Sequence, residues 1–286
     1  MSYCFLNGEI VPEEKAQVSV KDIGLLRAYG VYDGLAGIGS TPLFFHDHYG
    51  RFKSSAHFLE LRVPLAENEM RAVVEDLLIR HGFERSDIRV ILTGGETKFG
   101  IEPTGTTFFI LIEEHLLNGN TAKEGASVIL HEFARQDPVH KTINYATAVR
   151  LQPQKKKAGA SEILFHFGGK ILEASTSNVF IVKDGKIITP KEGILLGITR
   201  KYMLQIAGER GVLTEERDVS LEEFWGADEV FITSSFKDIV PITKADDRII
   251  GDGKVGPVSI KLQEEFNKLI LGTATALTLN GAEVVS

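Results

Sequence analysis

The chain has 286 residues, of which 43% are hydrophobic and 25% charged, and its formal net charge is −7. This length allows a hydrophobic core without disulfide or metal support, and this composition excludes a disordered or collagen-like chain. The acidic balance argues against nucleic acid as a partner. Cys4 is the single cysteine, which excludes an internal disulfide. The sequence shows no signal peptide and no apolar run near the about 20 residues of a membrane span, so we expect a cytoplasmic protein without a membrane partner.

The first part of the chain predicts a hairpin, short strands and two helices. Apolar residues flank Asn7-Gly8, which is the pattern of a two-residue hairpin turn. Helical spacing of apolar residues predicts helices at 43–61, with Asp47 as a cap, and at 70–81. Short strands are expected at 18–20, 30–32, 88–92 and 106–112.

The last part of the chain predicts further strands and three helices. Gly168-Gly169 and Asp184-Gly185 are typical of hairpin turns. Strands are expected at 127–130, 162–167 and 179–182. Helices are expected at 145–157, 199–210 and 259–271.

A polar stretch over 113–125 is the best candidate for a link between domains, because it is rich in Asn, Gly and charged residues. We therefore expect a smaller N-terminal α/β domain over 1–118, a linker over 119–125, and a larger C-terminal domain over 126–286. The mixture of elements predicts an α/β (α+β) fold in two lobes.

Lys141 stands just before a predicted helix, with few charges beside it. An amine in such a place can lose its charge through desolvation and become a nucleophile toward carbonyl groups. The alternative is a solvated surface lysine.

Glu173 ends a predicted strand and is followed by small polar residues that include Ser177 and Asn178. A carboxylate in this position can hold a protonated ring nitrogen. The alternative is a turn whose side chains satisfy its own backbone.

Two further segments can bind an anion. Gly197-Ile198-Thr199 begins a predicted helix, whose first N–H groups attract phosphate; the alternative is a plain helix cap. Ser234 and Ser235 follow a strand and form either an anion cradle or a simple turn.

Together and in this order, these segments resemble the fold-type IV enzymes that use pyridoxal 5'-phosphate (PLP). That group includes branched-chain aminotransferases, D-amino acid aminotransferases and aminodeoxychorismate lyases. The resemblance runs from Phe5-Leu6-Asn7-Gly8 to residues 251–257. Its most specific pieces are Glu-Ala-Ser-Thr-Ser-Asn-Val-Phe at 173–180 and Gly-Ile-Thr-Arg at 197–200.

The resemblance implies roles for individual residues. Lys141 matches the lysine that forms a Schiff base with PLP, and Glu173 matches the glutamate that pairs with the pyridine nitrogen. Arg51 matches the arginine that binds the phosphate, a role suited to a planar guanidinium. Further cofactor contacts are implied for Tyr145, Ser177, Asn178, Ile198, Thr199, Ser234 and Ser235. The family also implies a homodimer, with PLP held between the lobes.

The residues that bind substrate in this family depart from both standard patterns. D-amino acid enzymes use an arginine and a histidine two residues apart, where Thr97 and Phe99 stand here. Branched-chain enzymes use an arginine where this chain has Ala36.

Three other basic residues are candidates for binding a substrate carboxylate. Arg89 lies inside an apolar strand, where an unpaired charge is costly. We hypothesise that Arg89 binds the carboxylate, helped by Arg27 and Lys237, with Tyr32 also in the pocket. The alternative is that each basic residue lies on the solvent face of its strand. The arrangement resembles a less typical D-amino acid transaminase subgroup, which also carries Leu-Arg-x-Tyr-Gly and Thr-Gly-Gly segments.

The sequence therefore predicts a PLP-dependent transaminase acting on D-amino acids, with 2-oxoglutarate or pyruvate as acceptor. A branched-chain L-amino acid transaminase is the first alternative, and an aminodeoxychorismate lyase is the second. A non-catalytic paralogue that only binds is a different class. No metal is expected, because His46-Asp47-His48 lacks further ligands nearby and is better suited to a helix start.

Overall fold

The computed structural model describes residues 2–116 and 124–282, with side chains described up to residue 274. The chain folds into two compact units. As far as it is described, the first unit comprises Met1–Leu116, His140–Asn144 and Ile270–Ser286, and the second comprises Leu117–Val139 and Tyr145–Leu269. Most of the predicted linker at 119–125 lies outside the described residues, so the predicted domain boundaries stay a prediction.

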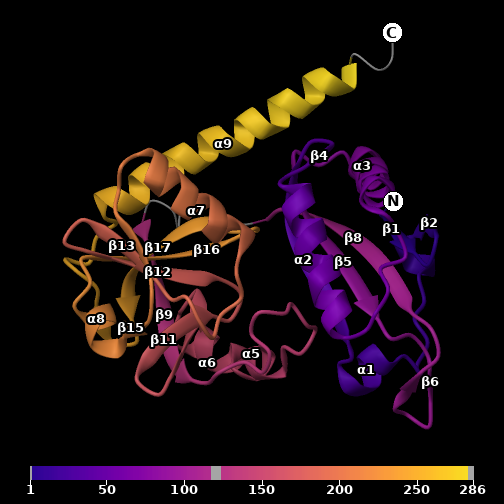
Figure 1. The fold of residues 1–286 in the computed structure, drawn as a ribbon, viewed down its shortest axis with the longest axis horizontal. Helices are drawn as coiled ribbons and strands as arrows, with labels where there is room; N and C mark the ends of the chain where they lie inside the picture. The colour runs from indigo at the N-terminus through magenta and orange to yellow at the C-terminus, as the bar shows by residue number, and fades with distance from the viewer. Residues whose placement is uncertain (1, 117–123, 283–286) are drawn as a thin grey trace. The chain divides into compact units, whose positions relative to one another are not determined.

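An antiparallel sheet of six strands forms the first unit, in the order β2-β1-β8-β5-β3-β4 (Figure 1). The Asn7-Gly8 hairpin is confirmed, since Leu6 pairs with Glu9 and both turn residues have positive φ. The strands are β1 (Tyr3–Leu6), β2 (Glu9–Pro12), β3 (Gly30–Ile38), β4 (Thr41–Pro42), β5 (Arg85–Thr93) and β8 (Thr107–Glu114). A separate small hairpin joins β6 (Thr97–Lys98) to β7 (Glu102–Pro103).

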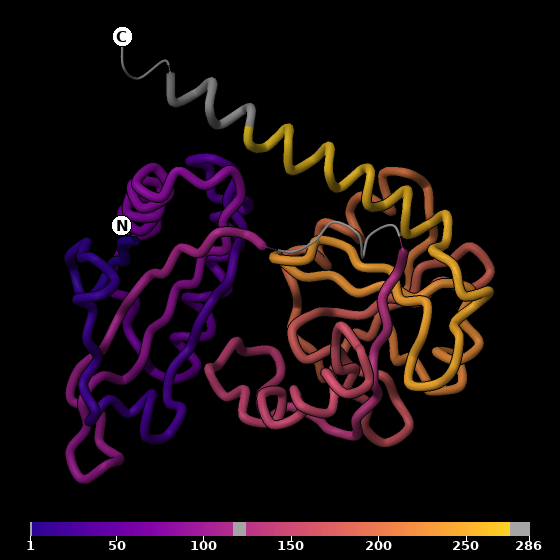
Figure 2. The backbone as a smooth tube through the Cα atoms, turned by 180° about the vertical axis from the view of Figure 1, so that it is seen from behind, coloured from indigo at the N-terminus to yellow at the C-terminus, as the bar shows by residue number. Residues whose placement is uncertain are grey.

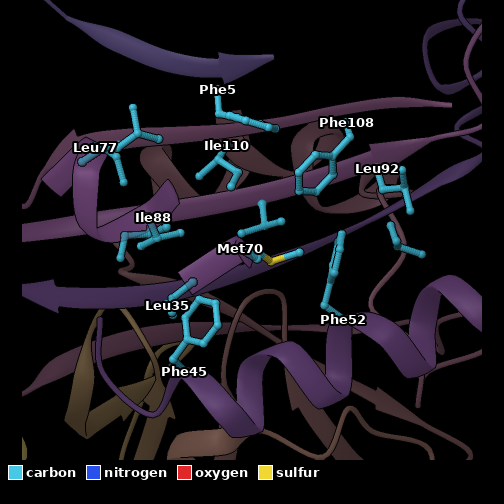
Figure 3. Close-up of a cluster of buried hydrophobic side chains, with 14 of the residues drawn as sticks. Phe5, Leu35, Phe45, Phe52, Met70, Leu77, Ile88, Leu92, Phe108 and Ile110 are labelled. Atoms are coloured by element: carbon cyan, nitrogen blue, oxygen red, sulfur yellow. The ribbon is translucent and has the colours of Figure 1, made fainter. Parts of the chain in front are cut away.

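Two helices, α2 (Phe45–Phe58) and α3 (Glu67–His81), cover one face of this sheet. Figure 2 shows the backbone of the unit from behind. Their apolar residues pack on alternate residues of β3, β5 and β8. Figure 3 shows this core, which includes Phe45, Phe52, Met70, Leu77, Ile88, Leu92, Phe108 and Ile110. The opposite sheet face carries the remaining residues of each strand. A short helix α1 (Ile23–Arg27) and a 3-10 turn η1 (Glu13–Lys15) complete the unit.

Two local predictions in this unit are wrong. Residues 18–20 form no strand, and Val20 is exposed, because its apolar alternation has no neighbouring strand with which to pair. Asp47 does not cap α2, because the helix begins at Phe45 after Phe44 in the left-handed region (φ 51°). Asp47 instead lies in the first turn, where its charge complements the helix dipole.

The second unit is built on a mixed ten-stranded sheet in the order β14-β13-β12-β16-β17-β9-β10-β11-β15, with β18 paired to β17. β9 pairs in parallel with β10 and β17, and β13 with β14. Both predicted hairpin turns are confirmed, at Gly168-Gly169 and Asp184-Gly185. The strands are β9 (Ala126–Glu132), β10 (Glu162–Phe167), β11 (Lys170–Ala174), β12 (Asn178–Lys183), β13 (Lys186–Thr189), β14 (Thr214–Glu216), β15 (Val219–Ser220), β16 (Glu229–Ser234), β17 (Asp238–Ala245) and β18 (Arg248–Ile249).

Helices α5 (Ala146–Arg150) and α6 (Gln152–Lys157) replace the single helix predicted at 145–157. The interruption at Leu151 follows from Pro153, which lacks an N–H group and suits the first turn of a new helix. The other helices are α7 (Ile198–Glu209), α8 (Leu221–Trp225) and α9 (Pro257–Ala282). Across the described residues, we find no helix with the length and apolar character needed to cross a membrane. The mixed α/β fold class is confirmed.

Candidate active site

Lys141 is held in the first unit by backbone pairing with β3. The Tyr32 N–H group donates to the Lys141 carbonyl oxygen at 3.0 Å, and the Lys141 N–H group donates to Ser55 Oγ at 3.0 Å. The Lys141 side chain is buried, and its Nζ lies 4.4 Å from the centroid of the Tyr32 ring. A buried amine against an aromatic ring is a suitable nucleophile toward a carbonyl group.

Arg51 of α2 is fixed by a buried carboxylate on β3. Its Nε and terminal nitrogen donate to the two oxygens of Asp33 at 2.8 and 2.7 Å, which is a bidentate pair. His48 Nδ1 lies 2.8 Å from Asp33 Oδ1. Lys141 and Arg51 are thereby attached to consecutive residues of one strand, Tyr32 and Asp33.

The charges of this cluster follow from burial and pairing. Burial alone would raise the pKa of Asp33, but the Arg51 charge and the hydrogen bonds from Arg51 and His48 hold it well below its usual range. Burial has the largest effect on His48 and lowers its pKa; the Asp33 charge and hydrogen bond oppose this, and the charges of Arg51 and Lys141 add to the lowering. The cluster therefore holds a charged Asp33 and a neutral His48 near pH 7.

Glu173 of β11 is buried in the second unit and held by two groups. Its Oε2 accepts a hydrogen bond from the Leu195 N–H group at 2.9 Å, and Arg135 Nε lies 3.5 Å from its Oε1. Arg135 also contacts Tyr145, with its guanidinium carbon 5.9 Å from the ring centroid. Arg135 was not among the residues predicted from the sequence. Arg135 stands in the loop that leads to Lys141, but no pattern of neighbouring residues in the sequence points to Glu173 as its partner.

The beginning of α7 offers backbone N–H groups to an anion. Among the described residues, no side chain caps this helix, whose N-cap is Gly197. Ile198 and Thr199 are both buried, and Asn178 Nδ2 donates to the Leu195 carbonyl oxygen at 2.6 Å. A Cβ atom at residue 197 would lie 2.1 Å from Asn178 Oδ1, so this close approach requires glycine.

A buried carboxylate joins the two polar turns beside this helix. Glu162 accepts hydrogen bonds from Ser175 Oγ and from Thr176 Oγ1 at 2.6 Å, and it pairs with the Lys237 amine. Burial would raise the pKa of Glu162, but the Lys237 charge and the hydroxyl donors hold it below its usual range.

The Glu162 cluster brings together several residues that the sequence predicts as cofactor contacts. Ser177 Oγ lies 3.5 Å from Glu162, and Ser234 Oγ accepts from the Lys237 N–H group at 3.2 Å. Ser235 lies between Ser234 and Lys237 in the same turn. Glu162 itself was not predicted, since its partners come from distant parts of the chain.

The residues predicted to bind substrate do not form one cluster of mutual contacts in the described structure. Arg89 of β5 forms an ion pair with Glu113, and Lys237 is engaged by Glu162 and Thr176. Arg27 is exposed at the end of α1, where it donates to the Leu26 carbonyl oxygen at 2.8 Å. Their substrate roles stay predictions.

His46 contacts an acidic side chain. Its Nδ1 lies 2.9 Å from Glu67. Within residues 2–116 and 124–274, no group of three or more His, Cys, Asp or Glu side chains is placed to hold a metal ion.

Known proteins match the chain over most of its length. Residues 30–245 match the family model for amino-transferase class IV. A Methanocaldococcus jannaschii protein provisionally named a branched-chain-amino-acid aminotransferase is 33% identical over 274 residues, which cover 93% of this chain and 95% of that protein. The D-alanine aminotransferase of Staphylococcus haemolyticus is 30% identical over 282 residues, which cover 94% of this chain and 98% of that enzyme.

A solved structure also matches the fold. The branched-chain amino acid aminotransferase of Escherichia coli superposes with a TM-score of 0.89 and 26% sequence identity. The match covers 95% of each chain.

Proposed function

The chain belongs to the class IV aminotransferases, which are PLP-dependent transferases, and we propose that Lys141 carries its chemistry and that D-amino acids are its favoured donors. The observation that supports this role is the burial of the Lys141 amine against the Tyr32 ring. A transaminase moves an amino group from an amino acid to a 2-oxo acid.

The residues present fit PLP by their chemistry. Its aldehyde needs an amine, its ring nitrogen a carboxylate, and its phosphate several N–H donors. Lys141 offers a buried amine and Glu173 a carboxylate whose orientation is fixed by Leu195. We assign the phosphate to Arg51, to the start of α7 and to the serine turns, namely Ser177, Asn178, Ile198, Thr199, Ser234 and Ser235.

The roles of the protein groups follow from this assignment. When bound, PLP supplies an electron-withdrawing ring that stabilises negative charge at the substrate Cα. Lys141 Nζ takes the proton from the substrate Cα as general base and then returns a proton as general acid. Glu173 would hold a proton at the ring nitrogen; Arg135 lies beside Glu173, and Tyr145 lies against Arg135. Arg51 stays in one orientation because the two Asp33 oxygens accept hydrogen bonds from its Nε and from one of its terminal nitrogens.

We assign substrate carboxylate binding to Arg89, with Tyr32 on the same sheet face and with Arg27 and Lys237 as further basic groups. The D-amino acid preference is supported by the 30% identity to a D-alanine aminotransferase. A branched-chain L-amino acid preference is the second candidate, supported by the likeness to the Escherichia coli enzyme.

We also propose a cytoplasmic homodimer. Leu25 of α1 and Phe99 and Ile101 of the β6–β7 turn are exposed apolar residues of the first unit. Arg27 and Gly100 lie close together, which brings α1 near this turn. A second copy of the chain covering these side chains would remove apolar area from water.

The visible absorbance of the purified enzyme with bound PLP tests this function. We expect that D-glutamate changes the absorbance band of the cofactor and that L-leucine does not. A Lys141→Ala variant should lose the conversion of D-glutamate while still binding PLP. A change with L-leucine alone would favour the branched-chain preference. A change with neither would contradict both proposed preferences and favour the lyase.

A further inference from the structure

Arg89 lies on the sheet face of the first unit that carries Lys141. Its neighbours Ile88 and Val90 are buried in the core under α2 and α3, so Arg89 points to the other face. Register pairs Arg89 with Gly34 and Ile91 with Tyr32, whose ring contacts Lys141 Nζ. The β3 residue directly opposite Arg89 is therefore a glycine, which has no side chain to contact the Arg89 guanidinium.

Glu113 of β8 is the acidic partner of Arg89 on this face. Register pairs Arg89 with Leu111, so Glu113 is its diagonal neighbour, two residues along the strand. The two side chains form an ion pair and are 36% and 59% exposed. Exposed pairs of this kind contribute little net free energy, so Arg89 can exchange Glu113 for another carboxylate at low cost.

A second acidic residue, Asp87, repels the Glu113 carboxylate and so weakens its ion pair with Arg89. Asp87 stands directly opposite Glu113 in the register, and like charges in opposite positions repel. Asp87 is itself bound by His115 Nδ1 at 2.8 Å and is largely buried. The Asp87 side chain is therefore fixed by His115. Glu113 is the carboxylate that can move away from Arg89.

We propose that Glu113 is a specificity-determining residue that competes with the side-chain carboxylate of a dicarboxylic substrate for Arg89. When the substrate has no such group, Glu113 neutralises Arg89. When the substrate is dicarboxylic, its carboxylate displaces Glu113. One site thereby accepts both an apolar and an acidic partner, as a transaminase with two different substrates requires. This inference rests on the proposed role of Arg89 in carboxylate binding.

Steady-state kinetics of the PLP-bound enzyme test the proposal, with 2-oxoglutarate and pyruvate as dicarboxylic and monocarboxylic acceptors. We expect Glu113→Gln to raise the ratio of kcat/KM for 2-oxoglutarate over pyruvate roughly two- to five-fold, mainly by a lower KM for 2-oxoglutarate. Glu114→Gln is the matched control, because it removes the same charge one residue along, on the opposite face of β8. Thermal unfolding of both variants checks that they fold alike.

Arg89→Ile separates the role of Glu113 from that of Arg89. We expect it to raise the KM for 2-oxoglutarate about ten-fold or more, and we expect Glu113→Gln to have no further effect in the Arg89→Ile background. If Arg89→Ile raises this KM but Glu113→Gln leaves the ratio unchanged or lowers it, the role of Glu113 is wrong and that of Arg89 stands. If Arg89→Ile leaves the KM unchanged, both are wrong.

Discussion

Asp33 is a buried carboxylate that orients Arg51 and contacts His48. It accepts two hydrogen bonds from Arg51 and contacts His48, and all three side chains are largely buried. We expect Asp33→Asn to lower the free energy of unfolding by about 3–5 kcal/mol, because it leaves the Arg51 charge buried without its carboxylate. PLP should also bind more weakly, which an absorbance titration measures. Asp76→Asn is the control: it breaks an exposed pair with Arg80 and should cost less than about 1 kcal/mol.

The pH dependence of this effect follows from the direction of the pKa shift. The pKa of Asp33 is held below its usual range, so its stabilising effect is fully present above the ordinary pKa of about 3.9 and is lost as the pH falls through the folded value. The difference in unfolding free energy between wild type and Asp33→Asn should therefore stay constant from about pH 5 to 8. Urea unfolding at several pH values measures it, and a difference that disappears by pH 5 would contradict the charge assignment.

At the scale of elements, the start of α7 depends on a close approach to Asn178, the first residue of β12. An alanine at residue 197 would bring its Cβ to 2.1 Å from Asn178 Oδ1, so either α7 or Asn178 must shift. We expect Gly197→Ala to weaken PLP binding at least ten-fold and to lower the melting temperature. Gly208→Ala, in the same helix with open space around it, should instead stabilise the protein by up to about 1 kcal/mol. Equal PLP affinity in the two variants would rule out a phosphate site at the start of α7.

Helices and strands could be predicted where the apolar pattern of the segment matches the element that it packs against in the fold. β5 and β8 alternate buried and outward residues, and both were predicted from apolar runs. The strand at 18–20 failed because alternation without a neighbouring strand cannot satisfy its backbone. Lys141, Arg51 and Glu173 were found through motifs, and the structure shows each with close polar or aromatic partners.

Arg135 and Glu162 were not predicted, because their partners are far away in sequence. Glu162 contacts Lys237, 75 positions away, and helices α5 and α6 and strand β10 lie between Arg135 and Glu173 in the sequence. A single sequence carries no local signal for such pairs. A buried carboxylate becomes evident only when the fold places hydroxyl and amine donors around it.

At the scale of the whole molecule, the exposed apolar side chains predict how copies of the chain associate. Phe99 is 94% exposed at the tip of the β6–β7 turn, and Leu25 and Ile101 are also exposed. Large apolar side chains grouped in this way favour a protein partner over water. We expect the wild-type protein to have the mass of a dimer by light scattering.

Phe99→Asp is the variant that tests this association, because a charge at the proposed interface must be desolvated when two copies meet. We expect it to weaken the dimer at least ten-fold in its dissociation constant. Leu213→Asp is the matched control, since Leu213 is an exposed apolar residue of the second unit, 65% exposed, and should leave the mass unchanged. A monomeric wild-type protein, or equal dissociation constants in the two variants, would show that these apolar residues of the first unit do not join two copies of the chain.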